Sequence, residues 1–171
     1  MARGLRRARA IGLVALALLV APTGSAAEEW GTIVPGETVV DQVRARYGAP
    51  SREARQKVEG YDTLQWVYEG ARAPEGIQRM TVDYGLLTPQ GYKPSVVRML
   101  RLEPKSKIFG RSTVMQGWGL PDGSSWENEQ ESIYYRSGLI ITFDKDNAFA
   151  TLLTFTPPQP DSPPRATPPK R

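Results

Sequence analysis

The fold is decided by the stretch IVPGETVVDQVRARYGAP at residues 33–50. Thr38 stands where a threonine can cap a helix, and Asp41, three residues later, takes the place of the glutamate in a capping box. Apolar residues then recur at the spacing of one helical face, at Val39, Val40, Val43 and Tyr47. Gly48 supplies a helix stop and Pro50 prevents the helix from resuming. We therefore expect a short amphipathic helix that ends at Tyr47.

The same pattern returns as VMQGWGLP at residues 114–121. Like residues 43–50, this stretch has an apolar residue, three further residues, an aromatic residue, glycine and, two positions later, proline. Recurrence of such a signature within one chain indicates a duplicated structural unit.

Three runs with the character of β-strands follow each expected helix. After the first helix, Leu64, Trp66 and Tyr68 alternate with other residues, which is the two-residue period of a half-buried strand. The remaining runs cover residues 77–84 and 96–102 and, after the second helix, residues 133–138, 139–144 and 150–155. Short connections between such runs favour antiparallel meanders.

The sequence therefore predicts an α+β fold class, with two tandem helix plus three-stranded antiparallel β-meander repeats that share a sheet or core. The expected limits are residues 28–103 for the first repeat and 104–156 for the second. The polar stretches at residues 52–59 and 122–130 are interpreted as connections. Residues 85–95 are interpreted as a loop of about 11 residues.

Residues 1–27 have the organisation of a Sec-type signal peptide. Four arginines lie among the first nine residues, and residues 10–21 form an uninterrupted apolar run that is short for a membrane span. Ser25-Ala26-Ala27 then offers the small residues that signal peptidase requires. A membrane anchor is the lesser alternative, and the absence of cysteine argues against a lipoprotein. We expect a protein of the periplasm or one that is secreted, with no membrane span after cleavage.

The charge balance argues against a nucleic-acid partner. The chain has 22 Lys+Arg and 18 Asp+Glu, but four arginines belong to the expected leader, so 22 − 4 = 18 basic residues remain against 18 acidic ones. Nucleic-acid binding is typical of domains with a basic patch. Residues 157–171 include seven prolines, so we expect a disordered Pro-rich tail there.

The chain has neither histidine nor cysteine. It therefore lacks the side chains of a Ser-His-Asp triad, a Cys-His pair or a thiolate zinc site. A pair of carboxylates that hydrolyses a glycan stays an open alternative, because any two acidic residues can meet in space. We expect no enzyme, no cofactor and no metal site.

One motif consists of Pro35-Gly36-x-Thr38, Val43 and Tyr47-Gly48-x-Pro50, followed by a strand that contains aromatic residues. This motif resembles the module of the BamE/SmpA outer-membrane assembly proteins. Two such modules in tandem are similar to the fold of the β-lactamase-inhibitor-protein superfamily. The resemblance covers about residues 32–155 and implies a non-catalytic binding scaffold of the cell envelope.

Exposed aromatic and apolar side chains are the candidates for partner contact, because tryptophan and tyrosine dominate binding interfaces. The candidates are Trp66, Tyr68, Leu86, Leu87, Tyr92, Trp126 and Tyr134. Basic residues at Arg98, Arg101, Lys105 and Lys107 form a strip suited either to peripheral contact with lipid headgroups or to a solvated strand edge.

The function expected from these features is protein binding in the periplasm or outside the cell, in envelope or outer-membrane assembly, with one or more envelope proteins as partners. The expected contact surface is the sheet face together with the loop at residues 85–95. The alternative is a secreted enzyme inhibitor of the β-lactamase-inhibitor-protein type, which would plug the active site of an enzyme with a loop.

Overall fold

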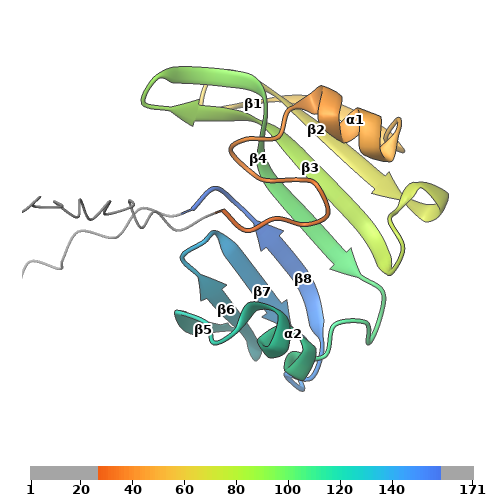
Figure 1. The fold of residues 1–171 in the computed structure, drawn as a ribbon, viewed down its shortest axis with the longest axis vertical. Helices are drawn as coiled ribbons and strands as arrows, with labels where there is room; N and C mark the ends of the chain where they lie inside the picture. Colours follow the sequence, from red (N-terminus) through yellow and green to blue (C-terminus); the bar gives the residue numbers. More distant parts are fainter. Residues whose placement is uncertain (1–26, 159–171) are drawn as a thin grey trace, which may run out of the picture.

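The computed structural model describes residues 27–158, which form one eight-stranded antiparallel sheet and two short helices (Figure 1). The strands lie in the order β1-β2-β3-β4-β8-β7-β6-β5. In chain order the elements are α1 (Val40–Tyr47), β1 (Arg52–Val58), β2 (Tyr61–Glu69), η1 (Gly70–Arg72), β3 (Ile77–Thr88), β4 (Gly91–Pro104), α2 (Arg111–Trp118), β5 (Gly123–Glu127), β6 (Gln130–Tyr135), β7 (Leu139–Phe143) and β8 (Ala150–Phe155).

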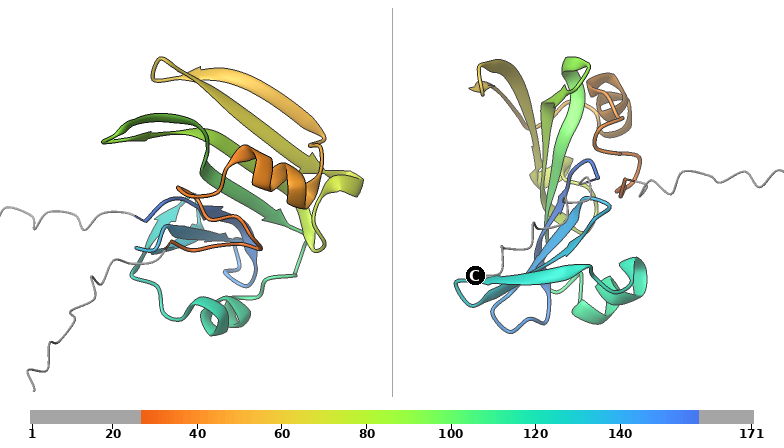
Figure 2. Two further views of the ribbon diagram at one scale, coloured as in Figure 1. Left: turned by 45° about the horizontal axis from the view of Figure 1, so that its top comes forward. Right: turned by 90° about the vertical axis from the view of Figure 1, so that its left-hand side faces the viewer.

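Both helices lie on one side of the sheet, which we call the helix face (Figure 2). The segment at residues 27–39 crosses the same face and joins the two halves of the sheet. The Gly36 N–H of this segment donates a hydrogen bond to the Val97 carbonyl of β4 at 2.8 Å. Its Glu28 N–H donates a hydrogen bond to the Ser137 carbonyl, in the second half of the sheet, at 3.2 Å. The opposite side, which we call the open face, carries no helix in the described part of the chain (Figure 2).

The predicted fold class is wrong. The described chain is one eight-stranded sheet in which four strands follow each helix, rather than two tandem helix plus three-stranded meander repeats. The missed strands are β1 and β5, which lie at the two ends of the sheet. Six of the seven residues of β1 and four of the five residues of β5 are exposed. An edge strand with neither face buried shows no alternation of apolar and polar residues, so its sequence is typical of a polar connection.

The expected loop at residues 85–95 is a hairpin. β3 continues to Thr88, β4 begins at Gly91, and Leu87 pairs with Tyr92 across the two strands. The hairpin projects beyond the rest of the sheet (Figure 1). It therefore buries few side chains, which explains why its sequence lacks the usual signal of a strand.

The start of the first helix also differs from the prediction. Thr38 does not cap α1, because its Oγ1 accepts a hydrogen bond from the Val34 N–H at 2.9 Å. At the start of α1, the Gln42 Oε1 instead accepts a hydrogen bond from the Val39 N–H at 2.8 Å. The predicted helix end is confirmed, since α1 stops at Tyr47 and Gly48 has a φ of 75°.

Each helix end is fixed to the sheet by one tyrosine. The Tyr68 hydroxyl donates to the Gly48 carbonyl at 3.1 Å, and the Tyr135 hydroxyl donates to the Gly119 carbonyl, also at 3.1 Å. These bonds satisfy carbonyl groups just beyond the helices, where intrahelical partners are absent. Both tyrosines therefore serve the packing of helix on sheet.

A continuous apolar core lies between the sheet and the elements on the helix face. It comprises Ile33, Val43, Trp66, Tyr68, Ile77, Met80, Val82, Tyr84, Val97, Leu100, Leu102, Val114, Ile133, Tyr135, Leu139, Ile141, Phe143, Ala150, Leu153 and Phe155. Because these residues come from α1, α2, the crossing segment and six strands, the two halves of the sheet share one core.

The predicted leader at residues 1–27 and tail at residues 157–171 lie, apart from Ala27, Pro157 and Pro158, outside the described residues. The predicted limits between repeats stay predictions. Within residues 27–158, no helix has the length and apolar character of a membrane span.

Candidate functional site

Two of the sequence-predicted contact residues belong to the core. Trp66 is 1% exposed and Tyr68 is fully buried, and both point to the helix face. The Trp66 ring packs edge-on against Tyr84 with centroids 5.1 Å apart. Neither side chain is available to a partner on the surface of this fold.

Three further candidates lie in the β3–β4 hairpin. Leu86 and Tyr92 are half-buried and Leu87 is 52% exposed. The Tyr92 ring stacks on Tyr61 with centroids 4.5 Å apart, and its hydroxyl donates to the Asp62 carbonyl. Tyr92 therefore joins this hairpin to the β1–β2 hairpin, and Leu87 is the most exposed of the three candidates.

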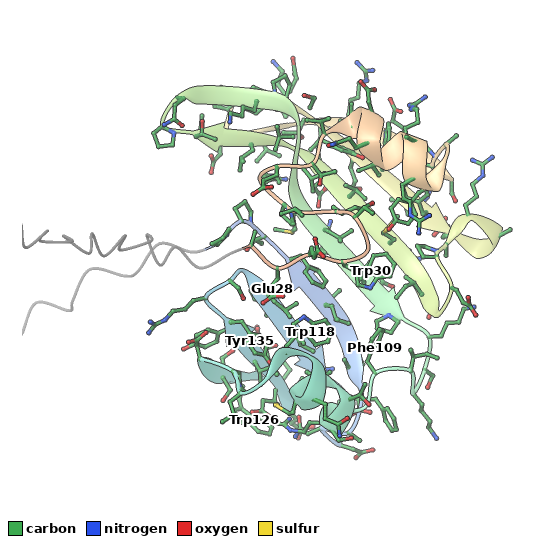
Figure 3. All side chains as sticks on the ribbon, in the orientation of Figure 1. Glu28, Trp30, Phe109, Trp118, Trp126 and Tyr135 are labelled. Atoms are coloured by element: carbon green, nitrogen blue, oxygen red, sulfur yellow. The ribbon has the colours of Figure 1, made fainter. Side chains whose placement is uncertain are left out.

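The last two candidates, Trp126 and Tyr134, are exposed at the other end of the sheet, with 62% and 43% of their surfaces accessible. Trp126 pairs with Glu131 across β5 and β6, and Glu131 contacts Arg111 of α2, so Trp126 points to the helix face. Tyr134 neighbours the buried Ile133 and Tyr135 along β6, so it points to the open face. Figure 3 shows Trp126 at the periphery, away from Trp30, Trp118 and Tyr135 nearer the middle of the molecule.

The ring of Tyr134 extends over the edge strand. Gly123 of β5 pairs with Tyr134, and a Cβ atom at Gly123 would lie 2.1 Å from the Tyr134 hydroxyl oxygen. Only a residue without a side chain leaves room for the ring here. The tyrosine hydroxyl therefore reaches the outer edge of the sheet on the open face.

Large exposed apolar side chains gather in the second half of the chain. Sequence reasoning missed Ile140, which lies beside Tyr134 on β7, and Leu120, which follows α2. Among residues 27–158, five of the seven such side chains lie beyond residue 104, namely Ile108, Leu120, Trp126, Tyr134 and Ile140; the other two are Tyr61 and Leu87. The run Leu139–Phe143 signalled a strand, but its sequence does not say that Ile140 faces solvent.

The two edges of the sheet differ in chemistry. β1 carries Arg52, Glu53, Arg55 and Lys57 among its seven residues, whereas Glu127 is the single charged residue of β5. Charged side chains on an edge strand discourage pairing with another chain. The β5 edge lacks this protection within the described residues.

The direction of the free backbone groups on β5 follows from its turn. β5 and β6 are joined by Asn128 and Glu129, with φ values of 50° and 64°, as in a two-residue type I′ hairpin. The residues that flank such a turn, Glu127 and Gln130, bond each other, and bonded pairs alternate with unbonded ones along the ladder. The N–H and C=O groups of Ser124 and Trp126 therefore point outward from the sheet.

Negative charge surrounds this edge. Residues 121–131 contain Asp122, Glu127, Glu129 and Glu131 and no basic residue. Glu131, largely buried, pairs with Arg111 of α2 at 2.6 Å, and the Arg111 guanidinium also lies 4.8 Å from the centre of the Phe143 ring. Burial raises the pKa of the neighbouring Tyr135 hydroxyl, with the charge of Glu28 adding to that effect. Glu127 forms no ion pair within residues 27–158.

A groove of about 550 Å³ lies between the two hairpins of the first half and the start of α1. It is lined by Val40, Arg55, Asp62, Thr63, Leu64, Pro94 and Ser95. One acid, one base and three apolar residues do not favour a particular ligand class. Within the described part of the chain, histidine, cysteine and acidic residues form no group that could hold a metal ion.

Comparison with known proteins gives one similar structure. No family model matches the chain, and no curated protein sequence matches it. A solved structure of a DUF4309 family protein (YjgB) from Bacillus subtilis is 11% identical, with a TM-score of 0.48, and the alignment covers 74% of this chain and 83% of that chain. The resemblance to the BamE/SmpA and β-lactamase-inhibitor-protein families stays a prediction from the sequence motif.

Proposed function

We propose that this chain is a non-catalytic, extracytoplasmic protein-binding module that holds its partner at the β5–β7 end of the sheet. The observation that carries the proposal is the exposure of Trp126, Tyr134 and Ile140 on three neighbouring strands. Tryptophan and tyrosine are enriched among the residues that contribute most to binding energy. None of the three is part of the shared core, so folding alone gives no reason for apolar side chains at these positions.

A non-catalytic role is supported by the reactive side chains that the sequence lacks and by the pairing of acids on the open face. The chain has no histidine or cysteine. Asp83, buried among the strands, contacts Arg101 at 3.0 Å, and Arg79 lies 3.2 Å from both Glu69 and Glu103. Carboxylates held in this way by arginine are suited to stabilising the sheet rather than to proton transfer.

Export is the first expectation to test. Expressed in a bacterial host from its own start codon, the chain should be recovered outside the cytoplasm with Glu28 as its first residue, because peptidase cleavage is expected after Ala27. Cell fractionation with N-terminal sequencing measures this. Recovery of the chain in the cytoplasm with residues 1–27 intact would contradict the proposed location.

Partner contact can be measured by photocrosslinking in cells that make the protein naturally. With a photoreactive phenylalanine analogue at Ile140, we expect a discrete adduct whose yield falls at least tenfold when Trp126 and Tyr134 are both changed to alanine, because aromatic anchors at interfaces contribute about 2 kcal/mol or more each.

The control places the same analogue at Gln56, on the charged β1 edge, where we expect no discrete adduct. Equal adducts from Gln56 and Ile140, or an adduct that the double substitution leaves unchanged, would rule out the β5–β7 surface.

One feature supports the alternative of a secreted enzyme inhibitor. The β3–β4 hairpin projects from the sheet, and Leu87 is exposed two residues before its turn. A projecting hairpin can enter the active site of an enzyme. We favour the β5–β7 end because it offers two neighbouring exposed side chains on the open face, Tyr134 and Ile140, and Trp126 on the helix face, rather than one exposed side chain. An adduct formed from an analogue at Leu87 instead of Ile140 would favour the inhibitor.

A further inference from the structure

We propose that the β5 edge binds an extended segment of a partner protein as a ninth strand of the sheet, and that this segment alternates apolar and basic side chains. This inference rests on the proposed function and names the mode and chemistry of that contact. Three features of the described residues carry it: the backbone of β5, the two aromatic side chains beside it, and the charge around it.

The first feature is the unsatisfied backbone. The outward N–H and C=O groups of Ser124 and Trp126 present the donors and acceptors that an added strand requires. No described residue pairs with β5 on its outer side. On the opposite edge, the corresponding turn at Glu59 and Gly60 also has positive φ values, so the outward positions of β1 are Glu53, Arg55 and Lys57. All three are charged, which makes β5 the edge that favours an added strand.

The second feature is an aromatic residue on each face of the edge. An added strand points successive side chains to opposite faces of the sheet. Those on the helix face would contact Trp126, and those on the open face would contact Tyr134, whose ring already lies across Gly123. Glu127, next to Trp126 along β5, points to the open face like Tyr134. An incoming strand that alternates apolar and basic residues can therefore place its apolar side chains against Trp126 on the helix face and its basic side chains near Glu127 on the open face, which is how strand addition acquires specificity.

The third feature is charge. Residues 121–131 carry four acids and no base, and three of these acids pair with basic residues of other elements: Asp122 with Arg136, Glu129 with Lys145, and Glu131 with Arg111. Glu127, at the end of β5, lacks such a pair among the described residues. A lysine or arginine of an incoming strand beside Glu127 would form an ion pair with this carboxylate, because opposite charges on adjacent strands attract.

Charge argues against one other occupant and proline content against a second. A second copy would place two acidic edges together, and like charges across a strand pair are unfavourable. The segment at residues 159–171 of this chain is basic at its end, but five of its 13 residues are proline, with no more than three consecutive residues free of proline. Proline lacks the N–H that a strand ladder needs.

The test uses the full chain and a fluorescently labelled peptide of about eight residues that alternates valine and lysine. Fluorescence polarisation should show binding about tenfold tighter than that of a matched peptide alternating valine and glutamate. Ser124→Pro should weaken binding of the valine–lysine peptide about tenfold, because it removes one outward N–H without breaking a bond to β6. Glu127→Gln should reduce the preference for lysine to about threefold or less.

Matched controls are Ser124→Ala, which keeps the N–H, and Arg55→Pro, which removes an outward N–H from the β1 edge. Both should bind like the unchanged chain, and circular dichroism should show that every variant is folded. No binding at about 1 mM peptide, or equal binding by the Ser124→Pro variant, would overturn strand addition.

The outcomes also separate this inference from the proposed function. If Trp126→Ala and Tyr134→Ala abolish the cellular adduct while Ser124→Pro does not, partner binding at the β5–β7 end is supported and strand addition is wrong. If sedimentation shows a dimer that Ser124→Pro dissociates, a second copy covers the edge and the partner segment is wrong. If none of the three substitutions changes the adduct, both proposals fail.

Discussion

Replacement of Trp66 by alanine is expected to lower the free energy of unfolding by about 3–5 kcal/mol. The indole is 1% exposed, so its removal loses the free energy of burying a large aromatic group and leaves a cavity in a close-packed core. Its Nε1 also donates to the Glu53 Oε2 at 2.9 Å, and the Arg44 guanidinium lies 4.7 Å from its ring centre. The substitution thus removes contacts to β1 and α1 together.

Equilibrium unfolding in urea, followed by circular dichroism, measures this loss. The matched control is Trp126→Ala, which removes the same atoms from a side chain that is 62% exposed. We expect the control to change stability by about 0.5 kcal/mol or less, as is typical of surface substitutions. Comparable losses for the two variants would mean that Trp66 is not in the core and that the assignment of the helix face is wrong.

Replacement of Gly138 by alanine is expected to cost about 2 kcal/mol or more. Gly138 joins β6 to β7 with a φ of 102°, a backbone conformation that side-chain-bearing residues rarely adopt. A Cβ atom there would lie 2.1 Å from the Thr156 carbonyl oxygen. Since the Thr156 N–H donates to the Gly138 carbonyl at 2.8 Å, the new methyl group would force the ends of β7 and β8 apart.

The same substitution at Gly117 is the control and should have the opposite sign. Gly117 lies within α2, has no positive φ, and would place a Cβ atom more than 4 Å from any atom other than its chain neighbours and the backbone of its own helix. Alanine in a helix interior is more stable than glycine by about 0.5–1 kcal/mol, so the midpoint of unfolding should rise. A Gly138→Ala variant as stable as the unchanged chain would contradict the tight approach of residues 138 and 156.

Local features of the fold were predictable wherever one residue acts alone. Gly48 ends α1 as predicted, because an αL-compatible residue followed by proline stops a helix in any context. The alternation of Leu64, Trp66 and Tyr68 predicted β2, since one face of that strand meets the core. The strands β1 and β5 were not predictable from periodicity, because edge strands exposed on both faces need no apolar side.

The candidate site was only half predictable. Trp66, Tyr68, Trp126 and Tyr134 are all aromatic residues in or near strand patterns, and nothing local separates the first two from the last two. The structure buries Trp66 and Tyr68 on the helix face. It leaves Trp126 exposed on the helix face at the edge strand and Tyr134 exposed on the open face, where no helix of the described chain lies. Ile140 and Leu120 were missed for the same reason.

The sequence by itself determined the absence of histidine and cysteine, the leader-like pattern at residues 1–27, the helix ends and most of the strands, because each depends on composition or on neighbours along the chain. Only the tertiary structure decided which strands lie at the edges, which face the helices cover and which aromatic side chains meet solvent. Those properties depend on contacts between residues far apart in sequence, and alternation along a strand defines two faces without saying which one is buried.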